Sequence, residues 1–310
     1  MTIDWNAFNP VKPLQPGIHE FQSYDLAEIA KYIDWQFFFI AWELHGKFPA
    51  ILSDEVVGKE ATHLYNDAQA MLKKIIEEKW LTARAVIGFF PANSNGADTV
   101  TVTAPDGAQV PLEFLRQQIK KAPGQPNMCL SDFIAPAESG KQDWIGAFAV
   151  TAGEGIEKWL DKFKKEHDDY SSIMLKALAD RLAEAFTELL HERVRKEFWG
   201  YAANEHLTND QLIAEEFLGI RPAPGYPACP EHTEKYKLFD LLSATASTGI
   251  TLTESLAMYP AASVSGWYMA NPEGKYFGLG KIDHDQLQDY ATRKGWDLET
   301  AEKWLRPSLD

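Results

Sequence analysis

The sequence of 310 residues is poor in cysteine and in positive charge. Its two cysteines, Cys129 and Cys229, cannot form a disulfide framework, and its first residues lack the charged-then-apolar order of a signal peptide. The formal net charge of −15 argues against nucleic-acid binding, because phosphate recognition needs clustered lysine and arginine. These features predict a protein of the reducing cytoplasm that has no nucleic-acid partner.

Long hydrophobic runs and common catalytic signatures are also missing. The longest apolar runs are well short of the roughly 20 residues that cross a bilayer, so no membrane span is predicted. The sequence has no glycine-rich phosphate loop, and its segment 263–266 lacks the first glycine of a hydrolase elbow. Cys229 and His232 offer two metal ligands without a second pair at suitable spacing. We therefore predict no metal site and no catalytic nucleophile.

The composition is that of a globular protein, with 45% hydrophobic and 24% charged residues. Three spaced prolines predict that residues 1–20 form an extended arm or the remnant of a linker, followed by one folded domain over residues 21–310. Helix-like and strand-like segments follow one another in blocks rather than in strict alternation. This order predicts an α+β fold with an antiparallel sheet.

Hydrophobic periodicity and turn residues predict the positions of the elements. Helices are expected at 25–33, 54–79, 156–166, 169–198, 209–217, 233–242 and 286–294, with a last one reaching residue 305. Strands or extended segments are expected at 85–90, 99–103, 111–114, 129–134, 144–151, 249–253, 265–270 and 274–282. A turn-forming loop is predicted at 91–96, and the segments 265–270 and 274–282 are expected to pair with each other.

The segment Arg221-Pro-Ala-Pro-Gly-Tyr-Pro227 is predicted to be a stiff, extended loop. Three prolines in seven residues fix φ and remove backbone donors, which excludes a helix interior or a central strand. An arginine, a glycine that allows close backbone approach and a tyrosine are typical of a ligand-holding loop. The same composition also fits a proline-rich connection that binds nothing.

Carboxylates stand at two unusual places in the sequence. Asp34 lies within an aromatic and aliphatic stretch, where it either caps a helix or binds a cationic group. Asp180, Glu184 and Glu188 are spaced four apart on a predicted helix, so they form a line of like charges that cations should offset. Arg181, Arg193 and Arg195 are the candidates for these cations.

Together these groups suit a cationic, zwitterionic and aromatic ligand. Arg221 can hold a ligand carboxylate with two hydrogen bonds, and Asp34 or Glu184 can hold an ammonium group. Aromatic faces at Tyr226 and Tyr276, with the backbone of residues 223–225, suit an adenine or a sulfonium.

The sequence resembles the C-terminal activation domain of cobalamin-dependent methionine synthase, which binds S-adenosylmethionine. The resemblance extends over nearly the whole chain, at residues 32–35, 55–58, 89–93, 131–136, 145–151, 191–196, 219–235, 252–255, 262–266 and 289–291. It implies a single C-shaped domain with a twisted antiparallel sheet flanked by helices, and S-adenosylmethionine in a groove on its concave face.

The resemblance also implies ligand-binding positions. Asp34 and Arg221 match residues at the amino-acid end of the ligand, and Glu184 matches a glutamate near it. The backbone at Ala223 and Gly225 matches the loop that contacts the nucleoside. Tyr276 and Phe277 match an aromatic pair, and Phe277 has no hydroxyl to donate, so it would make contact through its ring or backbone.

The resemblance implies that the chain takes part in the reaction cycle of the 5-methyltetrahydrofolate–homocysteine methyltransferase. Inactive cob(II)alamin would be reduced by one electron from a flavodoxin-type reductase and methylated by S-adenosylmethionine. The chain has no homocysteine zinc site, folate barrel or Asp-x-His-x-x-Gly motif, so cobalamin is expected on a partner domain. We expect an activation subunit or, given the proline-spaced first residues, a fragment of a longer chain.

Two other functions remain open from the sequence. The chain could be an interaction module that docks on a cobalamin-binding domain without binding a ligand. The chain could also be a free-standing methyltransferase that acts on a small molecule.

Overall fold

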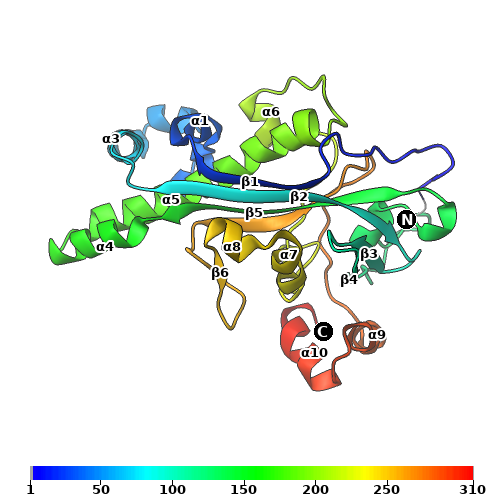
Figure 1. Ribbon diagram of the computed structural model, residues 1–310. Helices are drawn as coiled ribbons and strands as arrows, with labels where there is room; N and C mark the ends of the chain where they lie inside the picture. Colours follow the sequence, from blue (N-terminus) through cyan, green and yellow to red (C-terminus); the bar gives the residue numbers. More distant parts are fainter. Residues whose placement is uncertain (1–2, 310) are drawn as a thin grey trace.

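The computed structural model describes residues 3–309 (Figure 1). The strands are β1 (Gly17–Tyr24), β2 (Thr82–Ser94), β3 (Thr99–Thr103), β4 (Gln109–Glu113), β5 (Asp143–Glu154), β6 (Thr251–Leu252), β7 (Met258–Tyr259) and β8 (Ser263–Tyr268). The α-helices are α1 (Leu26–Ile29), α2 (Trp35–Ala41), α3 (Gly58–Glu77), α4 (Ile156–Lys165), α5 (Asp169–Arg193), α6 (Asn209–Ile213), α7 (Glu234–Leu242), α8 (Ala244–Thr248), α9 (His284–Lys294) and α10 (Leu298–Leu305). A π-helical turn, Val194–Phe198, continues α5.

The strands of the main sheet are antiparallel, which confirms the predicted fold class. Within residues 3–309 the sheet has six strands in the order β4-β3-β2-β5-β8, and β1 pairs with β2 along the same edge as β3. The long strands β2 and β5 run through the middle (Figure 1). A small separate sheet joins β6 to β7.

Both faces of the main sheet are buried. Successive side chains of a strand point to opposite faces, so Ile87 and Phe89 pack on the side of α5, while Val86 and Phe90 pack on the side of α7. Figure 1 shows α1, α3 and α6 on one side of the sheet and α7 and α8 on the other. A third cluster of buried residues joins α9 to α10.

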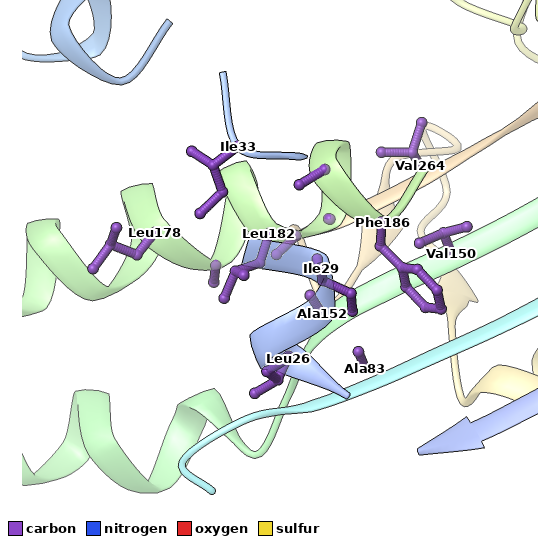
Figure 2. Packing of buried hydrophobic residues seen from close by; sticks show 14 of the residues in the cluster. Leu26, Ile29, Ile33, Ala83, Val150, Ala152, Leu178, Leu182, Phe186 and Val264 are labelled. Carbon is purple, nitrogen blue, oxygen red and sulfur yellow. The ribbon is translucent and has the colours of Figure 1, made fainter. Parts of the chain in front are cut away.

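The largest core fixes α5 against the N-terminal helices. Leu26 and Ile29 of α1 lie with Leu182 and Phe186 of α5 in one buried cluster, which extends to Val150 of β5 (Figure 2). Burying a large aliphatic or aromatic side chain contributes about 1.5–3 kcal/mol. The position of α5 across the sheet is therefore strongly determined, and so is the face that it presents to the loop at Arg221.

Three segments near the sheet have a different structure from the one predicted. Strand β1 begins at Gly17, inside the expected arm, because alternate residues His19 and Phe21 pack their rings on Phe198 at 5.0 and 6.0 Å. The predicted turn at 91–96 is wrong over 91–94, since β2 continues there and pairs with β3. Residues 130–133 form a 3-10 turn, and the Asp132 carboxylate accepts a hydrogen bond from the Cys129 N–H.

The predicted strand at 274–282 is also wrong, because the edge of β8 is already occupied. Ile220 and Met269 exchange both backbone hydrogen bonds, at 3.0 and 2.9 Å, and Trp267 N–H donates to the Pro222 carbonyl. Residues 274–282 instead run beside the loop, where Leu279 N–H donates to the Pro227 carbonyl at 2.8 Å. The proline-rich segment has taken the place of the expected strand.

The predicted helices are present, although some of their ends differ, but the short helices α2 and α8 were not among the predicted ranges. The segment 25–33 forms α1 and a 3-10 turn, and α3 starts at residue 58 rather than near 54. Helix α6 ends at Ile213 instead of residue 217, and Glu215 takes a φ of 56° beyond it. Among the described residues, no helix is both long and apolar enough to cross a membrane.

Candidate functional site

Two adjoining cavities lie between α5, α6 and the loop that starts at Arg221. The first has a volume of about 440 Å³ and the second of about 420 Å³, within the range typical of ligand sites. Both are lined by Glu184, Glu215, Arg221 and Tyr226. We call the two cavities together the groove.

The two parts of the groove differ chemically. The first, the apolar cavity, is walled by Phe148, Ala223, Val264 and Phe277 among others. The second, the acidic cavity, has four carboxylates and two arginines in its lining: Asp34, Glu184, Glu188, Glu215, Arg181 and Arg221. A ligand that fills both would place an apolar group in one and a charged group in the other.

Two side chains near the C-terminal end of α5 hold Arg221 in place. Its Nη2 donates to Glu188 Oε2 at 2.6 Å, and its Nη1 lies 3.0 Å from His191 Nδ1. Its guanidinium also lies over the Phe217 ring, 5.5 Å from the centroid. Burial works against the charge of Arg221, but Glu188 and Tyr276 outweigh it and keep the pKa raised, so the guanidinium remains charged.

The loop after Arg221 is extended at first and then turns tightly. Residues 220–222 lie along β8, and Gly266 of that strand has no room for a side chain, since a Cβ would lie 2.7 Å from the Pro222 carbonyl oxygen. Gly225 N–H then donates to the Cys229 carbonyl at 2.7 Å. The prediction of an extended loop therefore holds for the first residues only.

Tyr276 and Phe277 come from the segment that lies beside the loop. The Tyr276 hydroxyl accepts a hydrogen bond from the Arg221 N–H at 3.0 Å, and burial raises the pKa of this hydroxyl. The neighbouring Phe277 is buried and lines the apolar cavity with Gly278. This aromatic pair thus lies directly against the loop.

Asp34 is both a helix cap and part of the acidic cavity. Its Oδ1 accepts a hydrogen bond from Gln36 N–H at 2.8 Å at the start of α2, as the first of its two predicted roles requires. Asp34 also lines the cavity together with Tyr32 and Phe37. The two roles predicted as alternatives are compatible in this geometry.

The structure brings together seven of the eight predicted site residues. Asp34, Glu184, Arg221, Ala223, Tyr226, Tyr276 and Phe277 line the groove. Gly225 lines neither cavity and instead belongs to the tight turn closed by its hydrogen bond to the Cys229 carbonyl. Sequence reasoning assigned no site role to Glu188, His191, Glu215 or Phe217, although the spacing of Glu184 and Glu188 had already placed both on one helix face.

The predicted cations beside the acidic line are only partly right. Arg181 does pair with Asp180, at 2.5 Å. Arg193 pairs with Glu197 and Arg195 with Glu205, so neither offsets the line. Glu188 is paired with Arg221 of the loop instead. Burial raises the pKa of Glu184, although Arg181 and Arg221 oppose that rise.

Replacing Gly225 by alanine is expected to weaken ligand binding in the groove. Gly225 has a φ of 100°, and a Cβ there would lie 2.4 Å from the His232 ring, which Lys235 holds at 2.9 Å. The strain of about 1–2 kcal/mol and the clash would displace the turn that carries Ala223. Calorimetry with S-adenosylmethionine, the ligand that the sequence resemblance implies, measures the loss. Gly107→Ala is the matched control, with a φ of 88° and open space around it, and equal affinities in both variants would contradict the prediction.

The fold and the groove define an α+β domain whose groove suits a small zwitterionic ligand with an apolar part. The described residues contain no group of three or more histidine, cysteine or acidic side chains placed to hold a metal ion. Similarity to a known family and to a solved structure shows to which family within this class the chain belongs.

The family described as "Vitamin B12 dependent methionine synthase, activation domain" matches residues 25–295. The chain therefore belongs to this family. It is also similar to a crystal structure of the MetH reactivation domain bound to AdoHcy, with a TM-score of 0.96 and 51% sequence identity. That match covers 100% of this chain and 95% of the other.

Proposed function

We propose that the groove binds S-adenosylmethionine and presents its methyl group to a cobalamin carried by a partner domain, which reactivates methionine synthase. The observation that carries the proposal is the position of Arg221 at the boundary between the apolar and the acidic cavity. Family membership supports it, and so does the similar MetH domain that holds AdoHcy, the demethylated form of this ligand.

The two cavities suit the two ends of this ligand. Arg221 presents N–H groups for the carboxylate, and Asp34 and Glu184 present carboxylates for the ammonium group. The apolar cavity, with Ala223 and Phe277 in its walls, suits the nucleoside. In this arrangement the sulfonium lies near Glu184 and Tyr226, which line both cavities.

Charge in the acidic cavity favours S-adenosylmethionine over its product. The four carboxylates outnumber the two arginines in the lining, so the cavity carries an excess of negative charge. S-adenosylmethionine bears a sulfonium charge that is lost once the methyl group leaves. Opposite charge therefore attracts the donor more than the product, which supports release after transfer.

The role of this chain is to position the methyl donor. A bound cobalamin supplies the cobalt that accepts the methyl group after one-electron reduction, and family membership implies that a cobalamin domain is the partner. Holding the donor in one orientation lowers the entropic cost of the transfer. The proposal includes a flavodoxin-type reductase as electron donor and a cytoplasmic location.

Asp34→Asn tests the ligand assignment without removing the helix cap. Asparagine caps helices as well as aspartate does, so α2 should stay intact while the negative charge is lost. We expect S-adenosylmethionine to bind the unchanged chain at one site, and the variant to bind about 10- to 100-fold more weakly, as for a lost hydrogen bond to a charged group. Isothermal calorimetry measures both affinities.

Asp25→Asn is the matched control for this experiment. Asp25 caps α1 in the same way, through a 2.9 Å hydrogen bond to Ala27 N–H, but it does not line the groove. Its replacement should leave the affinity unchanged. If the unchanged chain binds no S-adenosylmethionine yet still binds a cobalamin domain, the chain is the ligand-independent docking module instead.

A further inference from the structure

The contact between Arg221 and His191 constrains the protonation of the imidazole. A guanidinium has only donors, so His191 Nδ1, 3.0 Å from Nη1, must be an acceptor and the ring proton must be on Nε2. Burial first, and then the nearby Arg195 and Arg221, lower the pKa of His191 well below its ordinary value. The ring is therefore neutral, with Nδ1 free to accept.

The His191 ring is also fixed in orientation. It is fully buried, stacks on Tyr268 at a centroid distance of 5.3 Å and 17°, and meets Phe217 edge-on at 4.7 Å. The Phe217 ring in turn lies 4.5 Å from the Arg195 guanidinium and 5.5 Å from that of Arg221. His191 therefore cannot rotate away from Arg221 without disrupting this packing.

Arg221 carries five N–H donors, and its contacts with α5 engage two of them. Glu188 takes one on Nη2 and His191 one on Nη1, both from the side of α5. Arg221 lines both cavities of the groove. With two donors held by side chains of α5, the plane of the guanidinium has a single orientation.

We propose that His191 is a positioning residue for recognition of the ligand's carboxylate. Together with Glu188 it holds the Arg221 guanidinium so that its remaining N–H groups meet the carboxylate in one preset geometry. His191 itself touches no ligand. This inference rests on the proposed binding of S-adenosylmethionine in the groove.

The test compares two ligands that differ only in the group that Arg221 recognises. S-adenosylmethionine carries the carboxylate, and decarboxylated S-adenosylmethionine lacks it. The ratio of their affinities measures carboxylate recognition and cancels general damage to the groove. Calorimetry gives this ratio for the unchanged chain, for His191→Phe, which keeps a buried ring without an acceptor, and for His191→Asn, whose Oδ1 replaces Nδ1.

We expect His191→Phe to reduce the preference for the carboxylate-bearing ligand about tenfold and to leave the affinity for the decarboxylated ligand unchanged. His191→Asn should recover most of the preference. The inference is overturned if His191→Phe keeps the preference, or if it weakens both ligands equally, as a packing role would. If the unchanged chain binds neither ligand, the proposed function fails together with the inference. Failure of the inference alone is distinguished by an unchanged chain that still binds S-adenosylmethionine.

Nitrogen-15 NMR of the histidine rings gives a readout that does not depend on the folding of a variant. The unchanged chain should show His191 as the neutral Nε2–H tautomer between about pH 5 and 8, across the range where an ordinary histidine titrates. A ring protonated on Nδ1 in this range cannot accept from Arg221, and that result alone would overturn the inference.

Discussion

Arg221→Met is expected to lower the affinity for S-adenosylmethionine about 100-fold. Truncating one partner of a buried, hydrogen-bonded charge pair costs about 2–5 kcal/mol, and here the ligand carboxylate would lose its only paired cation in the proposed pose. Glu188 would also lose its 2.6 Å partner, and its Oε1 already has none among residues 3–309. Calorimetry measures the affinity, and thermal unfolding measures the cost to the fold.

Two further variants separate binding from stability. Arg221→Lys keeps the charge but not the planar fork, so it should bind with an intermediate affinity. Adding Glu188→Gln to Arg221→Met removes the unpaired carboxylate, which should restore stability but not ligand binding. Arg193→Met is the matched control, because it makes the same substitution at an arginine that forms a partly exposed pair with Glu197. Tight binding by Arg221→Met would exclude Arg221 as the carboxylate site.

The sequence was sufficient to predict the extended start of the loop but not the partner of Arg221. Local rules of φ and donor loss fix the extended start of the loop, and those rules need no knowledge of the fold. The pairing of Arg221 with Glu188 and His191 depends on how α5 crosses the sheet, which the packing of Leu182 and Phe186 determines. Spacing along one helix could reveal the acidic line, but it could not identify a cation 33 residues away.

The segment 274–282 shows the same limit for strands. Its position after the turn-forming residues 271–274 suits the second strand of a hairpin, but a strand also needs a free neighbour with which to pair. Residues 220–222 occupy the edge of β8 despite Pro222, because Pro222 offers its carbonyl to Trp267 N–H and needs no N–H of its own there. Prolines therefore excluded a central strand, as predicted, and yet allowed this short edge pairing.

Lys294→Met is expected to lower the free energy of unfolding by about 3–5 kcal/mol, the cost of removing one partner from a buried ionic cluster. The Lys294 side chain at the end of α9 is only 5% exposed, and its Nζ lies 2.5 Å from Glu234 Oε1 and 3.5 Å from Glu231 Oε2. It also donates to Thr233 Oγ1 at 2.7 Å. Urea denaturation of the unchanged chain and the variant measures the difference.

The same change should weaken ligand binding, because residues 231–234 directly follow the ligand loop and Lys294 attaches them to α9. A second substitution, Glu234→Gln, removes one of the two stranded carboxylates and should restore part of the stability in the double variant. Lys303→Met on α10, an exposed lysine near Trp304, is the control and should change the free energy little. If Lys294→Met unfolds like the unchanged chain, the cluster is hydrated in solution, and α9 does not anchor the loop through it.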